Sequence, residues 1–354
     1  MPLSSYIVIF SVCVLSGVAI VSTQRWHGHL SADSTFGVQK IHVQDTARIG
    51  GIAIAMGLLV AWLLVGPDVR GILTPMLLAG IPAFVFGLAE DFTKVVGVLP
   101  RLLATMASGV LACLITGVAM QNTGFPPLDW LLQWWPLAVI FTAFAAGGVA
   151  NAINIIDGLN GLAAGSLAIM LSALGLMALN LGDAPVATVC FVVATCALGF
   201  GAINWPFGKL FLGDGGAYLM GFLLAWLAIL LPMRHTEINA WATILICAYP
   251  VLEVVFSILR RLSRDGHHPS SADRMHLHHL VHRRVVCRRC PNMSARLQNG
   301  FASPLCWLMA AFPCVLALVF MYNTWALAIC LGLTVCLYAA VYTRLSQFRW
   351  SFWR

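Results

Sequence analysis

Charged residues are scarce in this chain: only 9% of its 354 residues are Asp, Glu, Lys or Arg. A soluble domain carries roughly 25% charged residues, so the deficit excludes an ordinary water-soluble globule. Internal repeats and low-complexity stretches are also lacking, whereas hydrophobic residues make up 60% of the chain. This composition excludes a disordered chain, a collagen-like repeat and a small disulfide scaffold. It predicts a polytopic integral membrane protein.

About eleven apolar runs follow one another, each long enough to cross about 30 Å of hydrocarbon as a helix. Helices satisfy their own backbone hydrogen bonds in lipid, so we expect an all-α bundle that forms one membrane domain over residues 1–354. The first run has no basic residues before it, so we interpret it as a retained span and not as a cleaved signal. The runs lie near residues 6–22, 50–66, 72–88, 102–120, 132–150, 159–181, 186–204, 216–232, 238–259, 302–321 and 324–342.

Lys and Arg are distributed unevenly between alternate loops. With the N-terminus outside, 18 of the 20 basic residues fall in inside segments, and only Arg70 and Arg234 fall outside. Cytoplasmic loops carry such an excess, so we expect an outside N-terminus and a cytoplasmic C-terminus. The net charge of +7 is then explained by the basic residues that fix the orientation of the protein in the membrane. Nucleic acid is not expected as a partner, because no water-exposed basic domain is available to bind it.

The inside segments also carry eight of the 13 acidic residues, several of them next to apolar helix ends. A carboxylate near the bilayer is costly, which favours a functional interpretation of these positions. We therefore expect the catalytic groups in the inside loops near residues 23–49, 89–101, 151–160, 205–216 and 260–301.

Two of these loops have simple acidic patterns. Glu90 and Asp91 are adjacent, and two neighbouring carboxylates repel unless a cation or a shared proton neutralises them. The pair suits metal binding or base catalysis, although an exposed helix end is an alternative. Asp214 stands in a glycine-rich turn, where the backbone can approach phosphate and the next helix offers its N-terminus to an anion. A plain turn is the alternative there.

Asparagines lead to a third acidic residue. Asn151, Asn154 and Asp157 are spaced by three residues and therefore share one helical face, before glycines break the helix beside Asn160. Such amides and carboxylates can hydrogen-bond a base or a sugar, or bind a hard cation. Polar contacts between helices are the alternative.

Histidines gather in the longest polar segment. Arg274, His276, His278 and His279 suit recognition or protonation of a diphosphate. With His282, Cys287 and Cys290 the same histidines could instead form a zinc site. Apolar residues between 277 and 286 recur at helical spacing, which predicts an amphipathic helix on the inner leaflet, with a solvated basic loop as the alternative. Glu253, inside an apolar run, is expected to pair with a polar neighbour in the bundle, and a functional role for it stays open.

Taken in order, these blocks resemble the polyprenyl-phosphate N-acetylhexosamine-1-phosphate transferase family, glycosyltransferase family 4. The motifs are Gly-Leu-X-X-Asp (87–91), Asn-X-X-Asn-X-X-Asp-Gly-Leu-X-Gly-Leu (151–162), Gly-Asp-X-Gly (213–216) and His-X-His-His (276–279), with a first block around Lys40 to Gly51. The family includes bacterial undecaprenyl-phosphate N-acetylglucosaminyl 1-phosphate transferases and the muramoyl-pentapeptide transferase of peptidoglycan synthesis. The resemblance favours the N-acetylglucosaminyl branch, with the muramoyl-pentapeptide branch as the alternative.

The resemblance implies transfer of a sugar 1-phosphate from a UDP-sugar to undecaprenyl phosphate, with release of UMP. The product would start a lipid-linked surface glycan, such as an O-antigen or an exopolysaccharide, at the cytoplasmic face of the bacterial inner membrane. The family uses Mg²⁺, and Mn²⁺ is a possible substitute. A solute transporter is the alternative from another class, but the polar residues gather at helix ends and not at the bilayer midplane. Whether the protein forms a homodimer stays open.

The resemblance also implies roles for single residues. Asp214 becomes the leading Mg²⁺ ligand, joined by Asp91, while Glu90 and Asp91 lie beside the acceptor phosphate as catalytic groups. Two departures weaken parts of this assignment: Glu90 stands where many members have Asp, and Asn160 stands where several have Asp. The implied nucleotide and sugar ligands are Asn151, Asn154, Asp157 and Asn160. The implied diphosphate ligands are Arg274, His276, His278, His279, Lys40 and Arg48.

Overall fold

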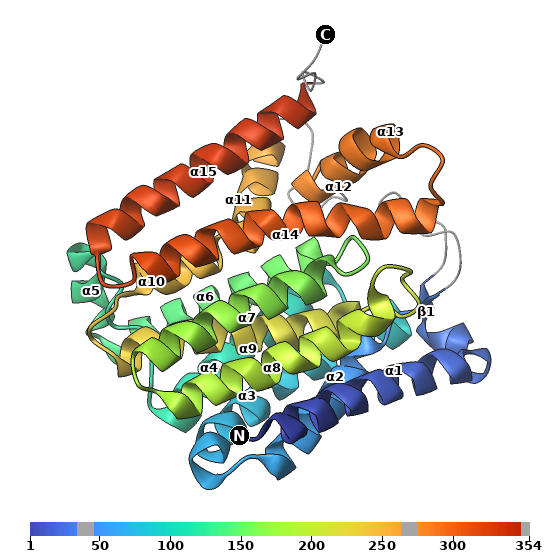
Figure 1. Cartoon of the computed structure of the whole chain (residues 1–354). Coiled ribbons are helices and arrows are strands. Elements are labelled where there is room, and N and C mark those ends of the chain that lie inside the picture. The colour runs from blue at the N-terminus through green and yellow to red at the C-terminus, as the bar shows by residue number, and fades with distance from the viewer. Residues whose placement is uncertain (34–45, 263–274, 348–354) are drawn as a thin grey trace.

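The computed structural model describes residues 1–33, 46–262 and 275–347, and its architecture is a bundle of helices (Figure 1). The only strands among these residues are β1 (Ala32–Asp33) and β2 (Thr46–Ala47), which pair antiparallel. The helices are α1 (Leu3–Ser31), α2 (Gly50–Leu64), α3 (Pro67–Thr93), α4 (Val98–Thr116), α5 (Pro126–Leu132), α6 (Trp135–Ile156), α7 (Leu162–Asn180), α8 (Ala184–Asn204), α9 (Gly213–Arg234), α10 (Ala240–Ile246), α11 (Ala248–Leu262), α12 (Leu277–Val281), a π-helical turn (His282–Val286), α13 (Cys287–Arg289), α14 (Ala295–Val319) and α15 (Thr324–Ser346).

The all-α membrane fold predicted from composition is confirmed. Within the described ranges, nine helices are long and apolar enough to cross a membrane, and α10 with α11 forms a tenth, bent by 76° at Cys247. The remaining apolar run became α2, which has only 15 residues. Every predicted run thus coincides with a helix or a bent pair. The count of eleven crossings stays a prediction, because α2 is short and α10–α11 is broken.

Helix α9 forms the centre of the bundle. Almost all its residues from Gly213 to Pro232 are buried, and α3, α4, α6, α7 and α8 surround it (Figure 1). Small residues permit this dense packing: a Cβ atom on Gly221 would lie only 2.7 Å from the Cα atom of Ala150 in α6. Because α9 is rigidly enclosed, any side chain at its first turn is held in a fixed place.

The outer helices present apolar side chains away from the protein. Leu15 in α1 and Ile329 in α15 are about two-thirds exposed, as expected for surfaces that contact lipid. Exposed aromatic residues, Trp130 and Trp134 near α5 and Trp325 at the start of α15, gather where α6 and α15 begin. Such residues are typical of the membrane–water interface.

The amphipathic helix expected on the inner leaflet is partly wrong. All five residues of α12 are buried, and α12 packs against α14 and α15 instead of lipid (Figure 1). Leu277 and Leu280 have no exposed surface. The prediction failed because it treated the histidines as a solvated polar face, whereas the structure turns them into the bundle.

Candidate functional site

One end of the bundle brings together three of the predicted acidic residues from distant parts of the chain. Asp91 ends α3, Asp157 follows α6, and Asp214 begins α9. The helices approach closely there, since a Cβ atom on Gly87 would lie 2.6 Å from the backbone carbonyl carbon of Asp214. The sequence prediction that these blocks converge is therefore confirmed geometrically.

Asp91 is almost fully buried and binds the backbone at the start of α9. Its Oδ1 accepts a hydrogen bond from the amide of Asp214 (2.8 Å), and its Oδ2 accepts one from the amide of Gly215 (2.9 Å). Its Oδ1 also lies 3.5 Å from Nε of Arg48. The N-terminus of α9, which we expected to receive an anionic ligand, already receives the carboxylate of Asp91. That expectation is corrected accordingly.

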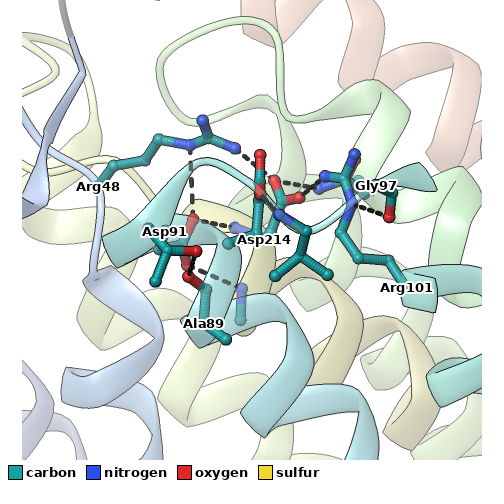
Figure 2. Close-up of polar contacts among 11 residues, drawn as sticks. Arg48, Ala89, Asp91, Gly97, Arg101 and Asp214 are labelled. Carbon is teal, nitrogen blue, oxygen red and sulfur yellow. Dashed lines mark hydrogen bonds and ion pairs between the residues drawn. The ribbon is translucent and has the colours of Figure 1, made fainter.

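Asp214 accepts hydrogen bonds from three side chains that belong to different segments of the chain. Arg48 donates to its Oδ1 and Arg101 to its Oδ2, and the two guanidinium groups approach from opposite sides (Figure 2). Asn154 adds a hydrogen bond from Nδ2 to Oδ1 at 3.0 Å. Only 3% of Asp214 is exposed. A buried carboxylate at this position requires such positive partners.

Arg101 was not identified as a site residue by sequence reasoning. It lies in the first turn of α4, within the predicted inside loop 89–101, and was counted only as evidence of topology. Its separation from Asp214 by 113 residues gives no local pattern that could reveal the pair. One signal could have suggested the role of Arg101: it is a basic residue in the first turn of a helix that follows a predicted catalytic loop.

Asp157 lies close to the same group of charges. It is half-buried at the C-terminus of α6, and electrostatic interactions link it to Arg48, Asp214 and Asp91. Burial raises the pKa of this carboxyl well above its usual range, and the nearby carboxylates raise it further, whereas Arg48 opposes the shift. A cation bound nearby would therefore stabilise the ionised form of Asp157.

The other predicted amides and carboxylate lie nearby but make different contacts. Asn151 donates from Nδ2 to Oγ1 of Thr105 (3.1 Å) and to the carbonyl of Gly147 (2.8 Å), which links α6 to α4. Glu90 is half-buried, and its Oε2 accepts from the amide of Val96 (2.8 Å). Glu90 thus fixes the turn between α3 and α4.

Asn160 joins three segments of the fold. Its backbone amide donates to Oδ1 of Asn299 (2.7 Å), its Nδ2 donates to the carbonyl of Pro206 (3.0 Å), and its carbonyl accepts from Oγ of Ser303 (2.7 Å). Only 7% of Asn160 is exposed. These contacts attach the 157–161 turn to α14 and to the loop before α9. For Asn160 the structure therefore favours the alternative of structural polar contacts, although these join loops to α14 and do not join two helices.

The histidines of α12 face the turn that follows Asp157. His276, His278 and His279 are buried, and the ring centroids of the last two lie 4.3 Å apart. A Cβ atom on Gly158 would lie 2.6 Å from Nε2 of His278 and 3.2 Å from Nε2 of His279. Burial lowers the pKa of His278 despite the opposing charge of Glu253, and lowers that of His279 to about 2. Both rings are therefore neutral at pH 7.

Two predicted diphosphate ligands, Lys40 and Arg274, lie outside the described residues. The zinc alternative gains no support from the part of the chain that is described. Cys287 Sγ lies 3.6 Å from Nε2 of His282, but no three His, Cys, Asp or Glu side chains there form a metal-binding group.

The acidic residues nonetheless fit Mg²⁺. This cation prefers oxygen ligands, keeps several waters, and is commonly bound by one or two carboxylates together with substrate phosphates. A site of three or more protein ligands is therefore not required. Asp214 and Asp157 supply hard oxygen donors, and, beyond the effect of burial, the neighbouring carboxylates of Asp91 and Asp214 raise the pKa of Asp157, an effect that a nearby cation would offset.

Comparison with known proteins identifies the family of the chain. Residues 73–232 match the profile of glycosyl transferase family 4. A Bacillus subtilis protein named "Probable undecaprenyl-phosphate N-acetylglucosaminyl 1-phosphate transferase" is 31% identical over 250 residues, covering 69% of this chain and 67% of its own. Proteins named undecaprenyl-phosphate alpha-N-acetylglucosaminyl 1-phosphate transferase from Yersinia pestis and Escherichia coli K12 are each 27% identical. The alignments cover 69% of this chain and 68% and 67% of theirs, respectively. Asp91, Asp157 and Asp214 all lie within the matched residues 73–232, and the chain belongs to glycosyl transferase family 4.

Proposed function

We propose that the protein transfers N-acetylhexosamine 1-phosphate from a UDP-linked donor to undecaprenyl phosphate. The names of its relatives support this acceptor and this type of sugar. The observation that carries the proposal is the convergence of Asp91, Asp157 and Asp214 with Arg48 and Arg101 at one end of a membrane bundle. Such a cluster of acids and arginines suits a diphosphate with its cation.

The reaction exchanges one phosphoanhydride bond for another. An oxygen of the lipid phosphate forms a bond to the β-phosphorus of the donor, and the bond from that phosphorus to the bridging oxygen breaks. UMP then leaves with the electron pair. Phosphoryl transfer depends mainly on positioning and on stabilisation of charge, so the protein's task is electrostatic. Mg²⁺, when bound, would supply much of the charge neutralisation at the diphosphate.

The residues at the site divide this work. Asp214 and Asp157 would hold Mg²⁺, whereas Asp91 holds Asp214 in place, because both its oxygens already accept backbone amides. Arg48 and Arg101 present guanidinium donors that match phosphate oxygens in geometry and charge. In the structure both guanidinium groups pair with Asp214, which places them beside the carboxylate that would hold the cation.

The site end of the bundle is proposed to face the cytoplasm of a bacterial inner membrane. The helix ends that carry the site border the loops rich in Lys and Arg, which supports this orientation. It also supports an outside N-terminus. The opposite end carries the exposed tryptophans near α5 and α15.

The test is transfer by the purified chain in lipid vesicles. Labelled UDP-N-acetylglucosamine and undecaprenyl phosphate should give a lipid-linked product and UMP only when Mg²⁺ or Mn²⁺ is present. Donors carrying N-acetylgalactosamine, 6-deoxy-N-acetylhexosamines or muramoyl-pentapeptide, supplied in parallel, identify the sugar. Faster use of the muramoyl-pentapeptide donor would replace the proposal with the peptidoglycan reaction. Uptake of solute without any lipid-linked product would replace it with transport.

A further inference from the structure

Glu253 lies inside the bundle on α11 and has no part in the chemistry described above. Only 1% of its surface is exposed, although the position belongs to an apolar helix. A buried carboxylate without partners would be strongly destabilising. The groups around Glu253 therefore indicate its role.

Five donors converge on this one carboxylate. The Oε1 atom accepts hydrogen bonds from Nδ1 of His278 (3.1 Å), from the amide of His278 (3.3 Å) and from the hydroxyl of Tyr249 (3.3 Å). The Oε2 atom accepts from the amide of Leu277 (3.0 Å) and from the hydroxyl of Tyr338 (3.1 Å). Glu253 thus satisfies the first two amides of α12 and holds the ring of His278, while Nδ1 of His276 lies 3.5 Å from its Oε2.

The hydrogen bond from His278 determines which ring nitrogen carries the proton. An ionised carboxylate can only accept, so Nδ1 of His278 must be the donor. In the neutral ring the other nitrogen, Nε2, then carries a lone pair. This nitrogen is available to accept a hydrogen bond or a proton.

Nε2 of His278 is buried and has no hydrogen-bond partner among the residues that the structure describes. It faces the turn after Asp157 and lies close to Gly158, which admits the ring because it has no side chain: a Cβ atom at that position would lie only 2.6 Å from Nε2. A fully buried nitrogen that lacks a partner and lies beside the acidic cluster is placed to meet a ligand. The direction in which Nε2 points is set by the orientation of the imidazole ring, and Glu253 holds that ring through Nδ1.

We propose that Glu253 is a positioning residue: it caps α12 and orients His278, so that Nε2 of His278 faces the ligand beside the Asp157–Gly158 turn. The catalytic purpose of this orientation rests on the function proposed above. The pairing of Glu253 with His278 is independent of that function. Glu253 touches no reacting atom and acts only through the imidazole. A carboxylate that orients a functional histidine commonly contributes roughly 10–100-fold to activity or ligand affinity.

The test compares Glu253→Gln with Tyr338→Phe. The glutamine has one acceptor oxygen and brings two donors into a ring of donors, so it cannot replace the carboxylate. We expect kcat to fall roughly 10–100-fold in E253Q with KM changed much less. Y338F removes one hydrogen bond from the same carboxylate but leaves His278 held, and we expect a change below about threefold. Equal losses in the two variants would indicate a purely structural role.

A double-mutant cycle separates positioning from general destabilisation. If Glu253 acts through the imidazole, adding E253Q to His278→Ala should lower turnover no further than H278A alone, within about twofold. Losses that multiply would overturn the proposal. Size-exclusion profiles and thermal unfolding of each purified variant establish that the comparison is between folded proteins.

Histidine ring nitrogen NMR gives a readout that needs no turnover. In the full-length protein labelled with ¹⁵N-histidine, the signal that disappears in H278A should show a protonated Nδ1 and an unprotonated Nε2. The opposite tautomer in the wild-type protein would contradict the proposal even if E253Q failed to fold. If the wild-type protein made no lipid-linked product, the proposed function would fail, while this signal would still decide the role of Glu253.

Discussion

Asp91 binds the backbone of Asp214: its carboxylate accepts the amides of Asp214 and Gly215 at 2.8 and 2.9 Å. A negative group at this point also interacts favourably with the positive N-terminal end of α9. One acidic residue of the site is therefore held in position by another, 123 residues away. The pair explains why a glycine-rich turn at the start of a central helix keeps a defined geometry.

Asp91→Asn should lower turnover by at least about 10²-fold while the protein still inserts and folds. Asparagine has a single acceptor oxygen, so one of the two α9 amides loses its partner and Asp214 shifts. The matched variant is Glu90→Gln, which keeps an oxygen for the hydrogen bond from Val96, removes only a charge that acts on Arg101, and should cost less. Initial rates measured at saturating substrate decide between them. Near wild-type turnover in D91N, or a larger loss in E90Q, would contradict the assignment.

Much of the fold could be predicted because apolar length and the period of the helix are local properties. Every predicted run coincides with an observed helix or bent pair, and the convergence of Asp91, Asp157 and Asp214 followed from their shared side of the membrane. The break within the run 238–259 was missed, because its Pro250 does not distinguish it from α3 and α14, which contain prolines and stay continuous.

The partners within the site could not be predicted, because they depend on contacts between distant helices. Arg101 pairs with Asp214, which lies 113 residues later in the sequence. The residues next to Arg101 in the sequence do not distinguish it from an arginine that only sets the orientation of the helices in the membrane. The burial of α12 likewise depends on Glu253, which lies 25 residues before His278 and on another helix. Asn160 matched a motif for ligand binding, yet its amide group is used to join loops.

Asp214→Asn should also lower turnover at least about 10²-fold, and it should weaken the binding of a divalent cation. The loss follows from removal of the carboxylate that carries the negative charge facing Arg48 and Arg101. Binding of Mn²⁺, followed by electron paramagnetic resonance with and without UDP-N-acetylglucosamine, provides the measurement. The wild-type protein should bind Mn²⁺ more tightly with the nucleotide sugar present, because phosphate oxygens complete the coordination. Turnover that survives EDTA would refute the role of the metal.

Arg101→Gln should reduce kcat/KM roughly 10–100-fold, since a hydrogen bond between charged groups contributes about 1.5–3 kcal/mol. Arg101→Lys should recover only part of the loss, because an ammonium group cannot form the paired contacts of a guanidinium. Lys209→Gln is the control, as Lys209 is an exposed basic residue in a neighbouring inside loop. Steady-state kinetics with varied UDP-sugar measure the effect. If R101Q and K209Q behaved alike, Arg101 would have no specific role in binding phosphate.

At the opposite end of the bundle, Asp183 joins α8 to α9. Its Oδ1 accepts the amide of Val186 (3.1 Å) and so caps α8, while its Oδ2 lies 2.8 Å from Nε of Arg234 and 3.0 Å from Nε2 of His235. Burial acts to raise the pKa of this carboxyl, but hydrogen bonds from His235 and Arg234 outweigh it, so the pKa is lowered. The charged form is thus favoured by folding.

Because its pKa is lower in the folded state, Asp183 should contribute its full stabilisation above the unfolded pKa of about 3.9 and lose it as the pH falls through the folded value. Asp183→Asn keeps an oxygen that can cap α8 and removes only the charge, whereas Asp183→Ala removes the cap as well, at a cost of about 1 kcal/mol. Thermal unfolding in detergent from pH 7 to pH 3 should show D183N less stable than the wild-type protein at pH 7 and the gap narrowing below about pH 4. The gap for D183A should persist in part at every pH, since the capping hydrogen bond from Val186 does not require a charge. A gap between D183N and the wild-type protein that widened on acidification would show that the charge of Asp183 opposes folding, contrary to the ion pair with Arg234.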